Sequence, residues 1–364
     1  MNKFKGSLLD KYIDEYVKEN VFSGVIRVTE KDKIIYERDV GFANYQEKTT
    51  FNKNSMFSFY SLSKPFCAIG LLRLYDLGLI DIDEHPKKYL AQMNGFDEKL
   101  KIRHLLHHVS GLPDFEQVKE YNEKYYNDSE NLLQELTILK DIASSVPPGT
   151  ETKYANINFE ICALIIEKVS GLTYEEYMRK EVFVPLGMKT ACIDSKDKCV
   201  ENRVQGNDYK NGELYAVDKA YRWMKGGGDI VGTVDDVYCL NLAIKQKKLL
   251  KEETWAQILT PSKINEFGMG CRIHKWHGKN AVWHNGGHYG FRTLHIQIFE
   301  DDFDLILLSN YGGGNARYDF AEAVFAARYG LDKNEQVKIK MDQGYIKEEN
   351  DIDRAKQLLY KMFF

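Results

Sequence analysis

Apolar residues recur with two different periods toward the ends of the chain. Over residues 7–20 they return at helical spacing, which predicts an amphipathic helix. The β-rich runs 24–30 and 33–43 follow, and the two residues between them suit a hairpin. A helical pattern over 315–330 lies near the other end. Before it, Gly, Asn or Asp turns separate four short β-branched or aromatic runs, at 267–276, 279–286, 291–300 and 302–310.

The middle of the chain has a helical pattern instead. Apolar helical runs, several of them stopped by glycine, cover residues 65–80, 102–108, 130–145 and 158–171. Strand-rich ends around a helical middle favour an α/β (α+β) fold, in which one antiparallel sheet is built from both chain ends and flanked by the terminal helices. We expect the α/β lobe at 1–58 plus 222–332 and an inserted all-helical lobe at 59–221. Residues 333–364 form a C-terminal extension that is expected to pack as a helix.

Composition narrows the class of protein. The chain has 364 residues, of which 43% are hydrophobic and 29% charged, so it is long enough for a sizeable core. The net charge of −4, with both signs interleaved, argues against a nucleic-acid partner. No apolar run reaches the roughly 18 residues of a membrane span, and Asp10, Lys11 and Asp14 interrupt the early apolar run where a secretory signal needs continuity. We therefore expect a cytoplasmic protein without a membrane partner. Its oligomeric state is open.

The first motif that can carry chemistry precedes the buried run at 65–80. Ser61 is followed three residues later by Lys64, so both side chains return to one helix face. A serine hydroxyl needs a base to become a nucleophile, and a desolvated lysine can be that base. Ser61 could equally be a capping serine. A second S-x-x-K match at 195–198 shows how often this pattern arises by chance, and its charged surroundings indicate a solvated loop.

Two later segments add groups that such a serine would need. Tyr154 and Asn156 follow a Pro-Gly turn and precede a helix; the tyrosine can relay a proton, and the asparagine can orient a lysine or donate to a substrate carbonyl. A second Y-x-N match, at 209–211, instead ends in an Asn-Gly hairpin turn. His284, Asn285 and Gly286 enter a strand whose glycines allow close approach of a substrate.

The histidines and cysteines raise the alternative that the chain holds a metal site. His104, His107 and His108 lie near one face of a short helix, but no local partner completes a zinc shell. A zinc site on the C-terminal strands would draw on histidines 274, 277, 284, 288 and 295. The six cysteines, at 67, 162, 192, 199, 239 and 271, are scattered and indicate buried reduced thiols rather than disulfides or zinc ligands. We expect no metal and no cofactor.

Taken in order, the motifs resemble those of the serine β-lactamase and penicillin-binding-protein superfamily, in its branch of class C β-lactamases, esterases and D-amino-acid peptidases. The resemblance covers about residues 10–330 and includes "FSFYSLSKPF", "IRHLLHHVSGLPDF", "PPGTETKYANINFE", "GGGDIVGTVDDV" and "HNGGHYGF". It implies Ser61 as acylated nucleophile, Lys64 as its activating partner and Tyr154 as the proton shuttle. Substrate-binding and oxyanion positions are then Asn156, His284, Asn285, Gly286 and Gly287, with the oxyanion held by the backbone N–H groups of Ser61 and Gly287.

One position bears on the substrate. Many β-lactamases and transpeptidases have a lysine where this chain has His284, and a histidine is mostly neutral at pH 7. Esterases and some D-aminopeptidases of the branch also have histidine there. The resemblance therefore implies a serine hydrolase of small esters, amides or peptides that forms an acyl-enzyme at Ser61. A penicillin-binding or β-lactam-hydrolysing protein, an acyltransferase and a non-catalytic acyl-binding sensor are the alternatives.

Overall fold

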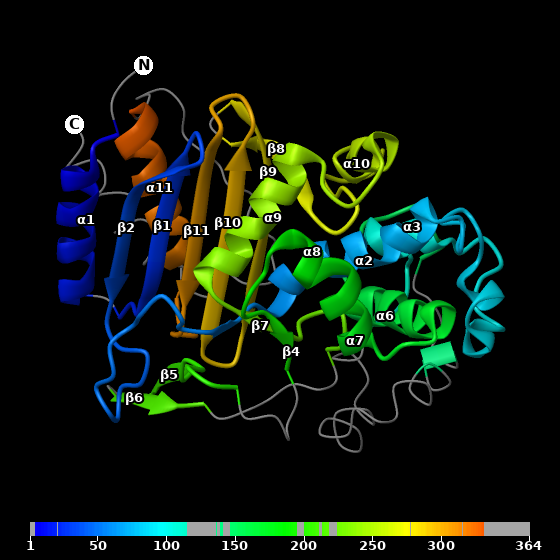
Figure 1. The fold of residues 1–364 in the computed structure, drawn as a ribbon, viewed down its shortest axis with the longest axis horizontal. Coiled ribbons are helices and arrows are strands. Elements are labelled where there is room, and N and C mark those ends of the chain that lie inside the picture. The colour runs from blue at the N-terminus through cyan, green and yellow to red at the C-terminus, as the bar shows by residue number, and fades with distance from the viewer. Residues whose placement is uncertain are drawn as a thin grey trace.

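A six-stranded antiparallel sheet built from both ends of the chain forms the centre of the structure (Figure 1). The structure is a computed structural model that describes residues 4–19, 21–114, 136, 139–140, 146–194, 200–210, 213–217, 224–276, 278–314 and 316–330. The strand order is β2-β1-β11-β10-β9-β8. The strands are β1 (Gly24–Glu30), β2 (Lys33–Val40), β8 (Arg272–Trp276), β9 (Lys279–His288), β10 (Phe291–Ile298) and β11 (Phe303–Ser309). Because β1 pairs with β11, the two chain ends meet in the middle of this sheet, as predicted.

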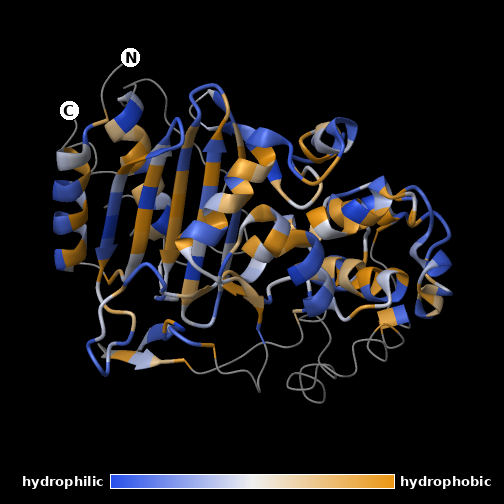
Figure 2. Cartoon of the chain, in the orientation of Figure 1, coloured by the Kyte–Doolittle hydropathy of each residue, from blue (hydrophilic) through white to orange (hydrophobic). Residues whose placement is uncertain are grey.

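The terminal helices α1 (Gly6–Glu19) and α11 (Ala316–Tyr329) cover one face of the sheet. Figure 2 shows the hydrophilic residues of α1 on its outer side and its hydrophobic residues toward the sheet. Tyr16 and Phe22 each pack edge-on against Phe320 of α11, with ring centroids 4.7 and 4.6 Å apart. The helix predicted over 7–20 is therefore confirmed, and its apolar stripe holds the two termini together.

The opposite face of the sheet carries α9 (Val234–Gln246) and adjoins the helices from the middle of the chain (Figure 1). These helices pack around α2 (Lys64–Asp76) and α6 (Ile157–Ser170), which are buried along most of their length. The other helical elements are η1 (Tyr60–Ser63), η2 (Pro86–Lys88), η3 (Ala91–Met93), α3 (Ile102–Leu106), α7 (Tyr174–Met178), η6 (Arg179–Phe183), α8 (Val184–Leu186) and α10 (Glu252–Ile258).

The segment expected to be helical, 59–221, also contains short strands. β4 (Cys192–Ile193) joins β3 (Phe57–Ser58) and β7 (Ile230–Gly232) in a small sheet of order β3-β7-β4. β5 (Asn207–Lys210) and β6 (Glu213–Ala216) form the hairpin predicted around 209–211. Strands of two to four residues are too short for a period to show in the sequence. The expected helix at 130–145 lies almost wholly outside the described residues, as does the extension 333–364, and the lobe boundaries stay a prediction.

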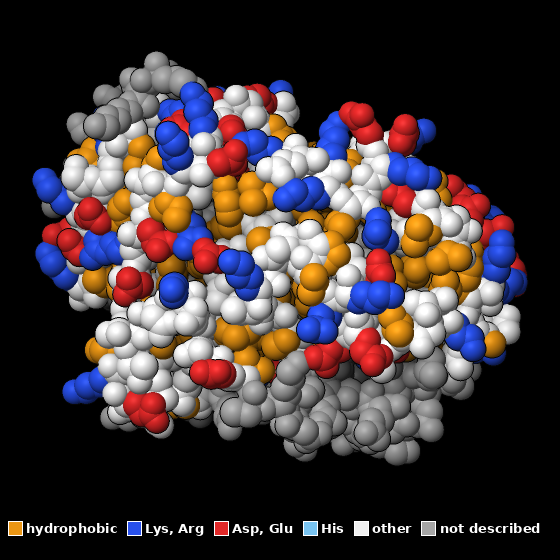
Figure 3. Space-filling model, viewed as in Figure 1, with side chains coloured by type: hydrophobic (Ala, Val, Ile, Leu, Met, Phe, Trp, Pro, Cys, Tyr) orange, Lys and Arg blue, Asp and Glu red, His pale blue; other side chains and the backbone are white. Residues whose placement is uncertain are grey.

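The surface and the cysteines add two observations. On the face shown in Figure 3, Lys and Arg side chains are interspersed with Asp and Glu. Within the described ranges, no helix is long and apolar enough to cross a membrane. Among the described cysteines, Cys67, Cys162 and Cys271 are buried, whereas Cys192 and Cys239 are only partly buried, so the expectation of buried thiols holds for the first three. Cys199 lies outside the described residues.

Candidate active site

Ser61 lies in η1, one turn before helix α2 begins at Lys64. The N-cap position of α2 is Ser63, which makes no side-chain capping hydrogen bond, so the reading of Ser61 as a capping serine is wrong. Tyr60, immediately before Ser61, has a φ of +49°, in the left-handed region that is costly for a bulky residue. A tight turn of this kind holds Ser61 at a fixed place. The second S-x-x-K match, at 195–198, lies outside the described residues.

Lys64 is fully buried, and its ammonium group has three oxygen partners. Nζ donates to Ser61 Oγ at 3.0 Å, to Asn156 Oδ1 at 2.8 Å and to the backbone oxygen of Gly227 at 2.7 Å. All three acceptors are neutral. Burial lowers the pKa of Lys64 to about 8, against the opposing effect of Asp114 and other acidic groups. A lysine with this pKa is present in part as the neutral amine near neutral pH, the form that can accept a proton from Ser61.

Gly227 is a contact that the sequence did not reveal. It lies in the glycine-rich segment 226–228, where Gly226 has a φ of +73°. A Cβ atom at Gly226 would lie 2.7 Å from the backbone oxygen of Phe159 in α6. The glycines therefore let this turn pack against the helices so that the Gly227 carbonyl reaches Lys64.

Tyr154 lies in the residues that lead into α6. Its hydroxyl donates to Ser61 Oγ at 2.8 Å, and Lys64 Nζ lies 5.0 Å from the centre of its ring. The ring stacks on His108, with centroids 4.2 Å apart and planes inclined by 22°. Ser61 Oγ therefore has a lysine and a tyrosine within hydrogen-bond distance. This is the geometry in which a proton can leave the serine and be delivered to a leaving group.

Asn156 is held by a carboxylate that sequence reasoning missed. Its backbone N–H and its Nδ2 both donate to Asp114 Oδ2, at 3.0 and 3.1 Å, while Oδ1 accepts from Lys64. The expectation that Asn156 orients a lysine matches this geometry. Asp114 follows Pro113 in the "SGLPDF" segment, and an acidic residue at the end of that segment was the only signal in the sequence.

The third motif lies on β9, which is not the outermost strand. β8 pairs with β9 only as far as Trp283, so residues 284–288 have a partner strand, β10, on one side only. His284 and Gly286 face η1, whereas Asn285 alternates to the opposite face with Trp283 and Leu294. The structure therefore does not bring the Asn285 side chain to the site.

Gly286 makes the close approach of η1 to the sheet possible. A Cβ atom there would lie 2.0 Å from the backbone oxygen of Phe59 and 3.1 Å from the backbone nitrogen of Leu62. Thr293, which pairs with Gly286 across the strands, donates from Oγ1 to the same Phe59 oxygen at 2.9 Å. This glycine and threonine dock the turn that carries Ser61 directly on the sheet. The neighbouring Gly287 is partly exposed.

His284 is buried and neutral. Burial, together with the nearby cations Lys64 and Arg272, lowers the pKa of His284 well below its usual value. Its Nδ1–H donates to the backbone oxygen of Asn285 at 2.7 Å, and Nε2 has no hydrogen-bond partner within the described part of the chain. His284 thus supplies a neutral acceptor and no positive charge.

Four of the other histidines make contacts that hold the fold together. His107 Nδ1 bonds the backbone oxygen of Phe267 at 2.9 Å, and His104 Nδ1 accepts from the Lys101 N–H at 3.2 Å. His108 packs on Tyr154, and His274 accepts from Trp283 Nε1. Among the described residues, no three or more His, Cys, Asp or Glu side chains form a cluster that could hold a metal ion. His277 is outside those residues.

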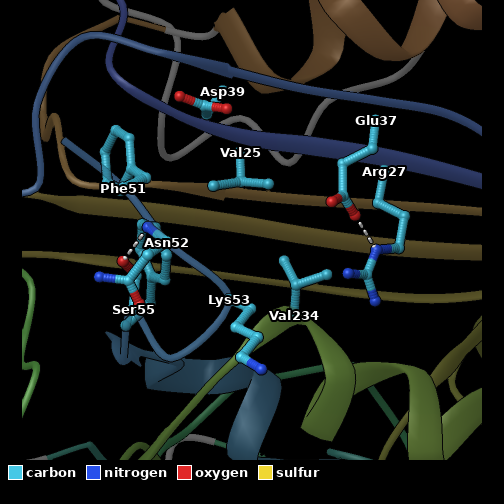
Figure 4. Close-up of a pocket in the computed structure, with 10 residues that line it drawn as sticks. Val25, Arg27, Glu37, Asp39, Phe51, Asn52, Lys53, Ser55 and Val234 are labelled. Atoms are coloured by element: carbon cyan, nitrogen blue, oxygen red, sulfur yellow. Dashed lines mark hydrogen bonds and ion pairs between the residues drawn. The ribbon is translucent and has the colours of Figure 1, made fainter.

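A small cavity of about 150 Å³ lies away from Ser61, between β1, β2, residues 51–55 and the start of α9 (Figure 4). Its wall combines apolar side chains such as Val25 and Phe51 with charged ones. Arg27, the buried cation there, is paired with Glu37 and Asp235. Ser61, Lys64 and Tyr154 do not line this cavity, so the acyl chemistry is not placed in it.

Known proteins resemble this chain over most of its length. The penicillin-binding protein 4* of Bacillus subtilis (strain 168) is 25% identical over 331 residues, which are 85% of this chain and 73% of that protein. The D-aminopeptidase of Gluconobacter oxydans (strain 621H) is 22% identical over 79% of this chain. The matched residues make up only 55% of that longer protein. The structure of EstCE1, a hydrolase with promiscuous acyltransferase activity, matches with a TM-score of 0.76 at 19% identity, over 89% of this chain and 98% of that one.

A family model described as Beta-lactamase matches residues 9–328, nearly the whole described chain. The fold is that of β-lactamases and transpeptidases, as the sequence motifs implied. Penicillin-binding proteins, D-aminopeptidases, a D-amino acid amidase and a hydrolase with promiscuous acyltransferase activity are among the matching proteins. The chain therefore belongs to the β-lactamase family, in its class C-like branch.

Proposed function

We propose that this protein is a serine hydrolase that forms an acyl-enzyme at Ser61 and transfers the acyl group of a small ester or amide to water. The carrying observation is that Lys64 Nζ and Tyr154 Oη lie 3.0 and 2.8 Å from Ser61 Oγ. A serine flanked by a buried base and a phenol has the groups needed for nucleophilic attack and for protonation of a leaving group.

These positions support a reaction in two steps, acylation of Ser61 and its deacylation by water. In acylation, Ser61 Oγ attacks the carbonyl carbon while its proton passes to neutral Lys64, and an oxyanion forms. The backbone N–H groups of Ser61 and Gly287 stabilise this oxyanion. As the oxyanion collapses, the bond to the leaving group breaks and Tyr154 gives its proton to that group, while the proton that Lys64 took from Ser61 passes to Tyr154. Water then attacks the acyl-enzyme and its proton passes to Lys64. The bond between the acyl carbon and Ser61 Oγ breaks as Tyr154 protonates this oxygen, and the Lys64 proton returns to Tyr154, which restores the starting state.

Substrate preference rests on His284 and on the relatives. His284 adds no cation near the bound substrate, so nothing at this position attracts the carboxylate that β-lactams carry. The likeness to D-aminopeptidases supports amides of D-amino acids as a substrate class to test first. Simple esters are the second class, because the esterases that the motifs resemble also have a histidine at the position of His284. The cytoplasmic location stays a prediction, for which cell fractionation is the test.

A substrate panel on the purified protein tests the proposal. It contains p-nitrophenyl acetate and butyrate, a D-alanine and an L-alanine p-nitroanilide, and a chromogenic cephalosporin, with Ser61→Ala as the blank. We expect turnover of an ester or a D-amide by the wild type, none by Ser61→Ala, and a Ser61-linked acyl adduct by mass spectrometry. Equal turnover in Ser61→Ala would sink the assignment. A stable adduct without turnover would favour the acyl-binding sensor, and efficient cephalosporin hydrolysis would favour a β-lactamase.

A further inference from the structure

Residues 108–114 lie beside residues 154–158, the segment that contains Tyr154 and Asn156, and contact it at three points. The ring of His108 stacks on Tyr154, at 4.2 Å between centroids. Ser110 Oγ donates to Asn158 Oδ1 at 2.6 Å. Asp114 accepts the Asn156 hydrogen bonds and, at 3.4 Å, the backbone N–H of Ile157. Three N–H groups therefore donate to the one carboxyl group of Asp114. These contacts give the "HVSGLPD" segment a part in holding the site.

The Asp114 contact fixes which way the Asn156 amide points. Nδ2 donates to Asp114 Oδ2 at 3.1 Å, so Oδ1 is the atom that faces Lys64 Nζ, at 2.8 Å. The flipped amide would place its NH₂ group against the ammonium and its oxygen against the carboxylate, losing two hydrogen bonds. Asp114, Asn156 and Lys64 thus form one directed chain, from carboxylate to amide to ammonium.

The direct partners of Lys64 carry no charge, so its balancing charge has to come from further away. Asp114 is the strongest of the acidic groups that raise the pKa of Lys64 against burial. Burial also raises the pKa of Asp229 to about 7, which makes Asp229 a weaker source of negative charge near neutral pH. Several elements that pack around Lys64 place a titratable or hydroxyl group near it. These groups belong to Ser61, Cys67, His108, Asp114, Tyr154, Glu160, Asp229 and His284.

We propose that Asp114 is a positioning residue for the reaction at Ser61. It holds the Asn156 amide with its carbonyl toward Lys64, and it supplies the fixed negative charge that stabilises the protonated lysine formed as Ser61 attacks. The inference rests on the proposed function, because it assigns Lys64 the role of base. It adds a residue that acts on that base without touching the substrate.

Asp114→Asn tests the inference because the side chain keeps its shape and one acceptor while losing the charge. The wild-type rate of acylation should rise with pH through the pKa of Lys64. Removing a negative charge lowers the pKa of a nearby lysine, so in the variant this rise should move to lower pH by about one unit or more. The plateau of kcat/KM for p-nitrophenyl acetate should fall roughly tenfold or more, because Asn156 is less firmly held. The ratio of wild-type to variant rates should therefore shrink as pH falls.

A matched control is Asp236→Asn. Asp236 is also buried, at 2% exposure, and accepts from the Thr233 N–H at 2.9 Å at the start of α9, away from Lys64. This variant should lose stability without moving the pH at which the rate rises. If Asp114→Asn shifts that pH no more than Asp236→Asn does, the inference is overturned. If Asp114→Asn does not fold, Asn156→Ala takes its place: a plateau within twofold of wild type would overturn the positioning role.

A readout independent of turnover separates this inference from the proposed function. NMR of protein labelled at lysine Nζ and Cε, with Lys64 assigned from Lys64→Arg, gives the pKa of Lys64 whether or not any substrate is cleaved. We expect the Lys64 titration to move to lower pH in Asp114→Asn. An unchanged titration would overturn the inference even if Ser61 is acylated. A shifted titration with Ser61→Ala still active would refute the proposed function but leave the link between Asp114 and Lys64 in place.

Discussion

The two faces of the six-stranded sheet bury very different side chains. Toward α1 and α11 the buried strand residues are mostly apolar, including Ile26, Leu294 and Leu305. The buried polar residues on this face are Arg272, which pairs with Trp283, and Ser309 at the end of β11. The other face keeps apolar residues such as Ile306 and Leu308 but also buries polar ones. The buried polar residues of this second face are Arg27, Thr29, His284, Thr293, His295, Gln297 and Asp304. Since successive residues of a strand alternate between faces, one set of strands presents both environments.

The two faces of the sheet differ in their role: the apolar face contributes to stability, and the polar face holds the groups of the proposed chemistry. Burying a polar group is unfavourable unless its hydrogen bonds are replaced, so a face that keeps many such groups is expected to have a use for them. At one end of the polar face, Gly286 and Thr293 dock the turn of Ser61, and His284 lies beside Lys64. The apolar face has no comparable feature among the described residues and serves to hold the terminal helices.

Removing the Tyr154 hydroxyl, which lies where the polar face meets the helices, is expected to have the largest effect on activity. Tyr154→Phe keeps the ring on His108 but deletes the hydroxyl that donates to Ser61 Oγ, so kcat should fall by roughly 10²–10⁴. Tyr177→Phe is the matched control, because it deletes a buried hydroxyl that donates to the Gly70 oxygen at 3.1 Å in the helical region. Steady-state kinetics on an ester should show the loss in the first variant only. Equal losses in both would deny Tyr154 its role as proton shuttle.

On the apolar face, Leu305→Ala should affect stability and leave the chemistry intact. Leu305 is fully buried in the middle of the sheet, and truncating such a leucine lowers the free energy of unfolding by about 2–5 kcal/mol. Urea unfolding measures the change. kcat at temperatures where the variant is folded should stay within about twofold of wild type. Leu77→Ala, at 59% exposure, is the control and should change little. A selective loss of kcat in folded Leu305→Ala would erase the distinction between the faces.

Much of this arrangement could be predicted from the sequence, because the signals are local. All strands of the main sheet except β8, and both terminal helices, are seven or more residues long, and Ser61, Lys64 and Tyr154 lie in recognisable motifs. Asp114 and Gly227 escaped prediction because each reaches Lys64 only through tertiary contacts between distant segments. Asn285 was assigned to the site as part of a three-residue motif, although a period of two places it on the same face as Trp283.

The pH dependence of stability should also come from the polar face. Burial raises the pKa of Asp304 from its ordinary value of 3.8 to about 7. Between these values the folded state holds a proton that the unfolded state has released, so the contribution of Asp304 to stability is full below about pH 4 and is lost as pH rises to about 7. In Asp304→Asn this side chain does not titrate, so its contribution to stability does not change with pH. Relative to wild type, the free energy of unfolding of this variant should therefore improve by about 1–3 kcal/mol from pH 5 to pH 8, as measured by urea unfolding. Parallel curves for the two proteins would contradict this.

The smallest effect concerns how α9 is held over the polar face. Lys245 of α9 bonds Asp32 at 2.8 Å in the β1–β2 turn and Asp302 at 2.5 Å in the β10–β11 turn. These side chains are 31%, 50% and 29% exposed, so solvent screens the pairs, and Lys245→Met should cost about 1 kcal/mol or less in unfolding free energy. The loss should shrink further in 1 M salt.

The reason for so small an effect is that α9 also buries Val237, Leu240 and Ile244 beneath it, and this apolar contact does not depend on salt. Urea unfolding of wild type and Lys245→Met at 50 mM and 1 M NaCl measures the salt-dependent contribution of the ion pairs and the part of the loss that salt does not change. The control is Lys18→Met, which removes the exposed ion pair between Lys18 and Glu15 on α1. A loss above about 2 kcal/mol that persists in 1 M salt would mean that charge, rather than apolar packing, holds α9. The polar face would then depend on ionic contacts for its stability as well as for its chemistry, and the division of labour between the two faces of the sheet would fail.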